Sequence, residues 1–157
     1  MVVKKVVKIG DKAPESALKD NRGKEIHLSD LKGKKVLLSF HPLAWTSVCA
    51  EQMKSLENNL TSFEKLNTVA LGLSVDSVPS KNAWAKSLGI KETKLLADFW
   101  PHGGFANQLG LFREKDGFSE RANVILDERQ KVVFVKIYKI PQLPDIKEII
   151  NFLKNLK

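Results

Sequence analysis

Residues 35–66 constrain the fold most strongly, because there a buried strand is joined to an amphipathic helix by a short loop. The largely apolar run 35–40 is typical of a strand buried on both faces. In the helix predicted over 47–66, apolar side chains recur at intervals of four, three, four and three residues, which places them on one face. These residues are Cys49, Met53, Leu56, Leu60 and Phe63. Thr46 or Ser47 is expected to cap the start of the helix.

Further strands and helices alternate along the rest of the chain. Strands are predicted at 24–28, 68–75, 95–97, 122–126 and 131–138, and helices at 79–88, at 105–110 and after Pro144. Alternation in the first half indicates parallel βαβ units, whereas the last two strands form an antiparallel hairpin. We therefore predict an α/β protein with a mixed central β-sheet flanked by helices on both faces, compatible with a thioredoxin-like fold. Because there is no internal repeat or linker, residues 1–157 are expected to form a single domain.

The basic charge of the chain is compatible with several kinds of partner. The formal net charge is +8, which by itself could indicate binding to nucleic acid or to an anionic membrane. The lysines are scattered, however, and only four arginines occur, whereas phosphate and base recognition favours clustered arginine. We therefore expect neither a nucleic-acid nor a membrane partner, although the charge can attract anionic substrates or an acidic protein.

The sequence predicts a cytoplasmic protein. No apolar stretch approaches the roughly 20 residues that cross a bilayer. Lysines interrupt the apolar residues of segment 1–8, so this segment does not have the uninterrupted apolar core of a signal peptide. A single cysteine without an export signal is typical of a reducing cytoplasm.

Cys49 is the only cysteine, and it lies in the first turn of the helix predicted over 47–66. A free thiol, with a pKa of about 8.5, is mostly protonated at neutral pH, and a helix start favours the thiolate through its partial positive charge and free N–H groups. Thr46 can place a hydroxyl beside the sulfur, and Pro42 can shape the loop without adding an N–H donor. The alternative is an inert core cysteine, since free cysteine is often buried. The place of Cys49 directly after a proline-containing loop favours the reactive role.

These residues resemble the active-site motif of the peroxiredoxins. Pro42, Thr46 and Cys49 match the pattern Pro-x-x-x-Thr/Ser-x-x-Cys. Arg121, 72 residues after Cys49, matches the family arginine that precedes a late strand. The resemblance extends to three further segments, namely 40–46, 98–103 and 10–14.

The resemblance implies a thiol-dependent peroxidase that reduces hydrogen peroxide and organic hydroperoxides, with a role in antioxidant defence and redox homeostasis. Cys49 would attack the peroxide and become a sulfenic acid. Thr46 and Arg121 would hold the peroxide oxygens, and Pro42 would shield the thiolate. The family uses no metal and no organic cofactor, and it implies a homodimer with loops near the active site at the interface.

The chain departs from many family members because it contains no second cysteine. Lys54 stands where some members carry a resolving cysteine, five residues after the first. The resemblance is therefore to a one-cysteine type, whose sulfenic acid is reduced by an external thiol: a low-molecular-weight thiol or a thioredoxin- or glutaredoxin-like protein. Ala50 stands where Thr or Ser is frequent in the family, and Gln52 where Glu is frequent.

Two other functions stay open at this point. A slowly reduced sulfenic acid can serve as a signal, so the chain could be a redox sensor or a chaperone-like protein. A basic binding module would instead show salt-sensitive nucleic-acid affinity that persists without Cys49. A pair of Cys49 with His41 would indicate papain-like acyl transfer, but no orienting Asn or Asp is evident, and strand alternation can turn His41 away from the sulfur.

The remaining histidines and the tryptophans have plainer interpretations. His102, in a Pro/Gly turn, is expected to be a surface or structural residue, and the histidines and Cys49 lack metal-ligand spacing. The three tryptophans, Trp45, Trp84 and Trp100, are expected to be packing residues. Trp45 and Trp100 could also wall an apolar pocket near Cys49 or an interface.

Overall fold

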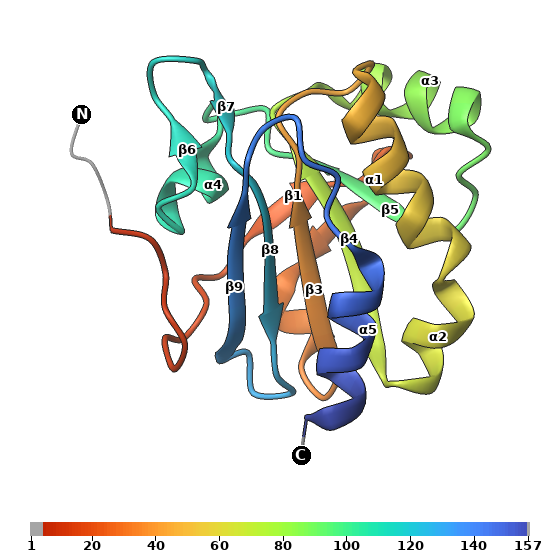
Figure 1. Ribbon diagram of the computed structural model, residues 1–157. Coiled ribbons are helices and arrows are strands. Elements are labelled where there is room, and N and C mark those ends of the chain that lie inside the picture. The colour runs from red at the N-terminus through yellow and green to blue at the C-terminus, as the bar shows by residue number, and fades with distance from the viewer. Residues whose placement is uncertain (1–4, 157) are drawn as a thin grey trace.

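The computed structural model describes residues 5–156 (Figure 1). Residues 1–4 of the N-terminal segment 1–8, whose lysines argue against a signal peptide, lie outside the described residues, as does Lys157. The large sheet contains β1 (Ala17–Lys19), β2 (Glu25–His27), β3 (Lys35–Phe40), β4 (Thr68–Ser74), β5 (Lys94–Ala97), β8 (Arg121–Leu126) and β9 (Val132–Tyr138). A separate hairpin consists of β6 (Phe112–Arg113) and β7 (Phe118–Ser119). The helices are η1 (Leu28–Leu31), α1 (Ser47–Asn58), α2 (Leu60–Lys65), α3 (Val78–Leu88), α4 (Gly104–Gln108) and α5 (Ile146–Asn155).

The central sheet is mixed, as predicted from the order of the elements. Its strand order is β2-β1-β5-β4-β3-β8-β9. β3 is parallel to β4, and β4 is parallel to β5, whereas β8 runs antiparallel to both β3 and β9. The carboxyl end of β3 therefore lies between the end of β4 and the start of β8. Residues far apart in the sequence meet at this edge of the sheet.

Helices cover both faces of the sheet. As a result, the alternating side chains of β3 are buried on both sides. Leu37 points into a core shared with α1, α2, α3 and α5, whereas Val36 and Leu38 point into a second core that includes α4. Figure 1 shows α1, α2 and α5 together on one side of the strands and α4 on the other. The first core contains Met53, Phe63, Trp84 and Ile149, among others.

The structure confirms most predicted elements but breaks the longest predicted helix. The strand 35–40 is β3 with the same bounds, and the late hairpin is β8 and β9. The single helix over 47–66 is wrong, because Asn59, with φ −114° and ψ 18°, separates α1 from α2. Asparagine is a poor helix former, and the side-chain amide of Asn59 donates to the Ser55 carbonyl over 2.7 Å.

The shortest strands gave no periodic signal in the sequence. β1 has three residues and β6 and β7 have two each, and no alternation extends beyond them, whereas the equally short β2 lies within the alternating run 24–28. By contrast, the predicted helix 79–88 corresponds to α3, which Gly89 ends in the left-handed conformation at φ 71°. The last helix begins after Asp145, whose carboxylate accepts from the Lys147 N–H.

Candidate active site

Cys49 lies where β3 passes into α1, at the carboxyl edge of the parallel strands. It is the third residue of α1 and is 1% exposed. The N–H groups of a first helical turn have no partner within the helix, so they can face an anion. Pro42, in the loop between β3 and α1, is buried as well. The loop and the helix start thus enclose the sulfur, as the position of the motif after a buried strand predicted.

Arg121 reaches Cys49 because β8 is paired with β3. The register sets Phe40 opposite Ala122, so Arg121 lies just beyond the end of β3. Its Nη1 lies 3.3 Å from Cys49 Sγ, and its Nε donates to the Ile140 carbonyl over 2.8 Å. Arg121 is 2% exposed, so its charge acts on the sulfur with little screening by water. A guanidinium donor at this distance can form a charge-assisted hydrogen bond with an anion at this position.

Gln52 orients the arginine, although the sequence analysis noted it only as a departure from the family pattern. Its Oε1 accepts from Arg121 Nη1 over 2.7 Å. Its Nε2 donates to Ser39 Oγ over 2.8 Å and to the Phe40 carbonyl over 3.1 Å. Gln52 is buried and follows Cys49 by three residues, on the same helix face. A polar residue on this apolar face was the signal that could have identified it.

Thr46 begins α1 through its backbone, not through its side chain. It occupies the cap position with extended backbone angles, as predicted, but its hydroxyl makes none of the capping hydrogen bonds expected of such a residue. The hydroxyl donates instead to the Leu43 carbonyl over 2.8 Å, within the loop, and the residue is exposed. Of the four predicted site residues, Arg121 and Cys49 are in direct contact, and Pro42 and Thr46 belong to the adjoining loop.

His41 belongs to a buried polar cluster beside the loop. Its ring packs against Trp84, with centroids 5.4 Å apart, and its Nε2 lies 3.3 Å from Lys81 Nζ. Burial, together with the charge of Lys81, lowers the pKa of His41 well below its usual value, so the ring is neutral. A neutral ring whose Nε2 faces Lys81 is the reverse of the imidazolium–thiolate pair of a papain-like site.

The other singled-out residues divide between core and surface. Trp84 is buried, as predicted, whereas Trp45 is 56% and Trp100 is 81% exposed, so packing is the wrong prediction for those two. Trp45 Nε1 donates to Ser80 Oγ over 2.9 Å. His102 Nε2 pairs with the Gly117 carbonyl at 2.6 Å, in keeping with a structural role.

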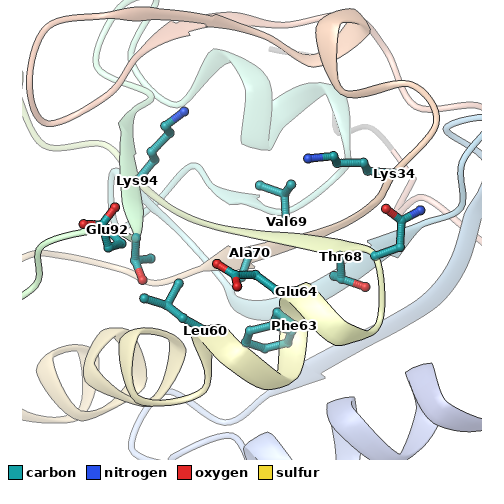
Figure 2. A pocket seen from close by; sticks show the side chains of 11 residues that line it. Lys34, Leu60, Phe63, Glu64, Thr68, Val69, Ala70, Glu92 and Lys94 are labelled. Atoms are coloured by element: carbon teal, nitrogen blue, oxygen red, sulfur yellow. The ribbon is translucent and has the colours of Figure 1, made fainter.

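A cleft of about 420 Å³ lies at the amino-terminal ends of β4 and β5, whereas Cys49 lies at the carboxyl ends of the parallel strands. Figure 2 shows the charged side chains of Lys34, Glu64, Glu92 and Lys94 around Val69. None of the predicted site residues lines it.

Within residues 5–156, no three His, Cys, Asp or Glu side chains gather in a way that could hold a metal ion. Across the same residues, no helix combines the length and apolarity needed to cross a membrane.

Comparison with known proteins identifies the family. Residues 9–135 match the AhpC/TSA family. Alkyl hydroperoxide reductase E of Mycobacterium tuberculosis is 32% identical over 89% of this chain and 92% of its own length. Bovine peroxiredoxin-2 is 32% identical over 93% of this chain and 77% of its own length. The crystal structure of the reduced 2-Cys peroxiredoxin of Plasmodium vivax has a TM-score of 0.84 at 27% identity, covering 93% of this chain and 80% of that one. The crystal structure of Enterococcus faecalis AhpC shares the fold, with a TM-score of 0.86 at 22% identity. The match covers 93% of this chain and 90% of that one. The chain therefore belongs to the AhpC/TSA family and is a peroxiredoxin, a thiol-dependent peroxidase.

Proposed function

We propose that Cys49 is the nucleophile of this peroxidase and that it reduces hydrogen peroxide and organic hydroperoxides. The observation that carries the proposal is the contact of Arg121 Nη1 with Cys49 Sγ, in the first turn of α1. Both the guanidinium and the helix start favour the thiolate, which is the reactive form of the residue. The same donors can hold the peroxide oxygens as negative charge develops on the departing oxygen.

The reaction is a displacement at oxygen. The Cys49 thiolate attacks the terminal, hydrogen-bearing oxygen of the hydroperoxide and forms an S–O bond while the O–O bond breaks. The departing oxygen takes a proton and leaves as water or an alcohol, and Cys49 becomes a sulfenic acid. Arg121 acts as a catalytic residue through its donors, and Pro42 acts as a shield of the thiolate. Thr46 donates its single hydroxyl proton to the peroxide once it gives up its hydrogen bond to the Leu43 carbonyl.

Reduction of the sulfenic acid requires a thiol from outside the chain, because Cys49 is the only cysteine. A first external thiol forms a mixed disulfide and releases water, and a second one restores the Cys49 thiol and leaves as a disulfide. Since Cys49 is 1% exposed, a small thiol needs little opening of the site. A thioredoxin- or glutaredoxin-like protein requires the first turn of α1 to move outward.

We propose further that the chain acts as a single-domain homodimer in the cytoplasm, in antioxidant defence and redox homeostasis. Large apolar side chains are exposed in the loop before α1 and directly after β5, at the same edge of the sheet. They are Leu43, Trp45, Phe99 and Trp100. Exposed apolar patches of this kind commonly mark protein–protein contacts. Sedimentation equilibrium of the wild type and of Trp100→Glu tests the dimer, and a monomeric wild type would contradict it.

Stopped-flow kinetics test the peroxidase proposal. The reduced protein is mixed with hydrogen peroxide or cumene hydroperoxide, and Trp45, four residues before Cys49, reports through its fluorescence. We expect a second-order change that is absent in Cys49→Ser. Arg121→Lys should lower the rate constant about 10- to 100-fold, because a point charge cannot reproduce the guanidinium contacts.

Arg129→Lys is the matched control, since Arg129 lies at the far end of β8 from Cys49, in the turn before β9. Its rate constant should equal that of the wild type. Peroxide consumption retained by Cys49→Ser would overturn the proposal. So would a wild-type rate no higher than that of free cysteine at the same pH.

A further inference from the structure

Lys81 is completely buried, which is rare for a lysine without a paired carboxylate. It lies on α3 and is 0% exposed. Within residues 5–156 it forms no salt bridge. Its Nζ donates to Ser74 Oγ and approaches His41 Nε2 at 3.3 Å, with the Trp84 ring centroid 5.9 Å away. A lysine is seldom held in such a position unless its amine has a role there.

The hydrogen bonds of Lys81 lead into the active-site loop. Ser74, at the end of β4, donates its hydroxyl proton to Asp76 Oδ2 over 2.6 Å. The same oxygen accepts from the Ala44 backbone N–H over 2.8 Å, in the loop that carries Pro42 and Thr46. The protonated amine of Lys81 has donors only, so in this state His41 Nε2 accepts from it. Lys81 is thus tied to the loop at two points, at His41 directly and at Ala44 through Ser74 and Asp76.

Charged groups face Lys81 from each element around it. Cys49 lies on α1, Asp76 follows β4 and Asp98 follows β5, and the charges of all three act on the lysine. His41 is kept neutral by burial, with the charges of Lys81 and Arg121 adding to that effect. Burial lowers the pKa of Lys81 to about 7, although the surrounding anions oppose the shift. Lys81 therefore gains or loses its proton near neutral pH, within electrostatic reach of Cys49.

We propose that Lys81 is a positioning residue of the peroxidase site. Its buried ammonium group holds the loop through Ser74, Asp76 and His41, and it supplies a second positive charge, besides Arg121, that favours the Cys49 thiolate. This role rests on the proposed function of Cys49 as the nucleophile. The positive charge is present below about pH 7 and is lost above it, so the support that Lys81 gives to the thiolate falls as the pH rises.

Two Lys81 variants separate the charge from the hydrogen bonds. Lys81→Gln keeps N–H donors without a charge, whereas Lys81→Met removes both, and Lys35→Met, on the far end of β3, is the matched control. The thiolate is titrated by its ultraviolet absorbance, and the rate constant with hydrogen peroxide is measured over the same pH range. Below about pH 7, both variants should react with hydrogen peroxide roughly tenfold more slowly than the wild type, because the second positive charge beside the sulfur is missing. Above about pH 8 the Lys81→Gln curve should converge on that of the wild type, whereas Lys81→Met should keep the part of its deficit that comes from the lost hydrogen bonds.

The reciprocal titration needs no Lys81 variant. The titration midpoint of Lys81, followed by NMR of its side-chain methylene next to the amine, should fall in Cys49→Ser, because the thiolate charge that favours the ammonium is gone. An unchanged Lys81 midpoint in Cys49→Ser overturns the inference. So does a rate deficit in folded Lys81 variants that is the same at every pH, because a merely structural role predicts such a constant deficit.

The titrations do not depend on peroxide turnover. If the titrations of Lys81 and Cys49 depend on each other but the wild type does not consume peroxide, the proposed function fails. The electrostatic link between Lys81 and Cys49 then still stands. If the wild type consumes peroxide but the titrations are independent, only the role of Lys81 fails.

Discussion

The substitution Lys81→Met should make the protein more stable at acidic pH while it impairs the site. Burial lowers the pKa of Lys81 from 10.5 to about 7. The unfolded chain therefore binds this proton more tightly than the folded chain does. Below about pH 7 the difference reduces the free energy of unfolding of the wild type by about 5 kcal/mol. Methionine fills a similar volume without a charge, so the variant avoids this cost.

The variant also loses hydrogen bonds, which reduces the gain. His41 Nε2 would remain buried without a donor, at a cost of about 1–3 kcal/mol, whereas Ser74 keeps its bond to Asp76. We therefore expect a net stabilisation of about 2–4 kcal/mol at about pH 6. As the pH rises from about 7 toward 10.5, Lys81 of the folded wild type loses its proton, and the cost of burying the charge disappears. The advantage of the variant should shrink by about 3 kcal/mol by about pH 9.

Urea unfolding of the reduced proteins at about pH 6 and about pH 9 measures both quantities. Lys35→Met is again the control, because the side chain of Lys35 is 14% exposed and pairs with Glu128 at 3.7 Å. The reasoning is refuted if Lys81→Met is less stable than the wild type at about pH 6. It is equally refuted if the difference in the free energy of unfolding is the same at both pH values.

Three further substitutions test the packing and the hydrogen bonds around the site. Gly72→Ala should lower the free energy of unfolding by about 1–3 kcal/mol in urea, because the added Cβ would collide with Met53 Sδ and lie 2.8 Å from Leu95 Cδ2; a loss below about 0.5 kcal/mol would contradict this packing. Gln52→Ala should slow the peroxide reaction about tenfold in stopped flow, because Arg121 loses the acceptor that orients it; an unchanged rate would remove Gln52 from the site. Asp145→Ala should cost about 1 kcal/mol in thermal or urea unfolding through loss of the α5 cap, with unchanged peroxide kinetics.

Local patterns predicted the elements whose side chains are regularly spaced. β3, α3 and the β8–β9 hairpin were identified because their burial and their turn residues repeat over several positions. The break at Asn59 was missed, because the apolar spacing continues across it and the change in direction depends on how α2 packs against β4. The role of Gln52 was missed for a related reason. Its partner, Arg121, lies 69 residues away in the chain.

The order of residues alone predicts Cys49 in the first turn of a helix after a buried strand, since spacing and apolar pattern are local properties. It also excluded an internal disulfide, because no second cysteine exists. Which groups surround the sulfur depends instead on tertiary packing. Strand pairing between β3 and β8 carries Arg121 to within 3.3 Å of Cys49, and the packing of α3 against the sheet turns Lys81 from an ordinary helix lysine into a buried charge. The physical reason is that burial and electrostatic contact depend on long-range pairing, which no local periodicity in the chain records.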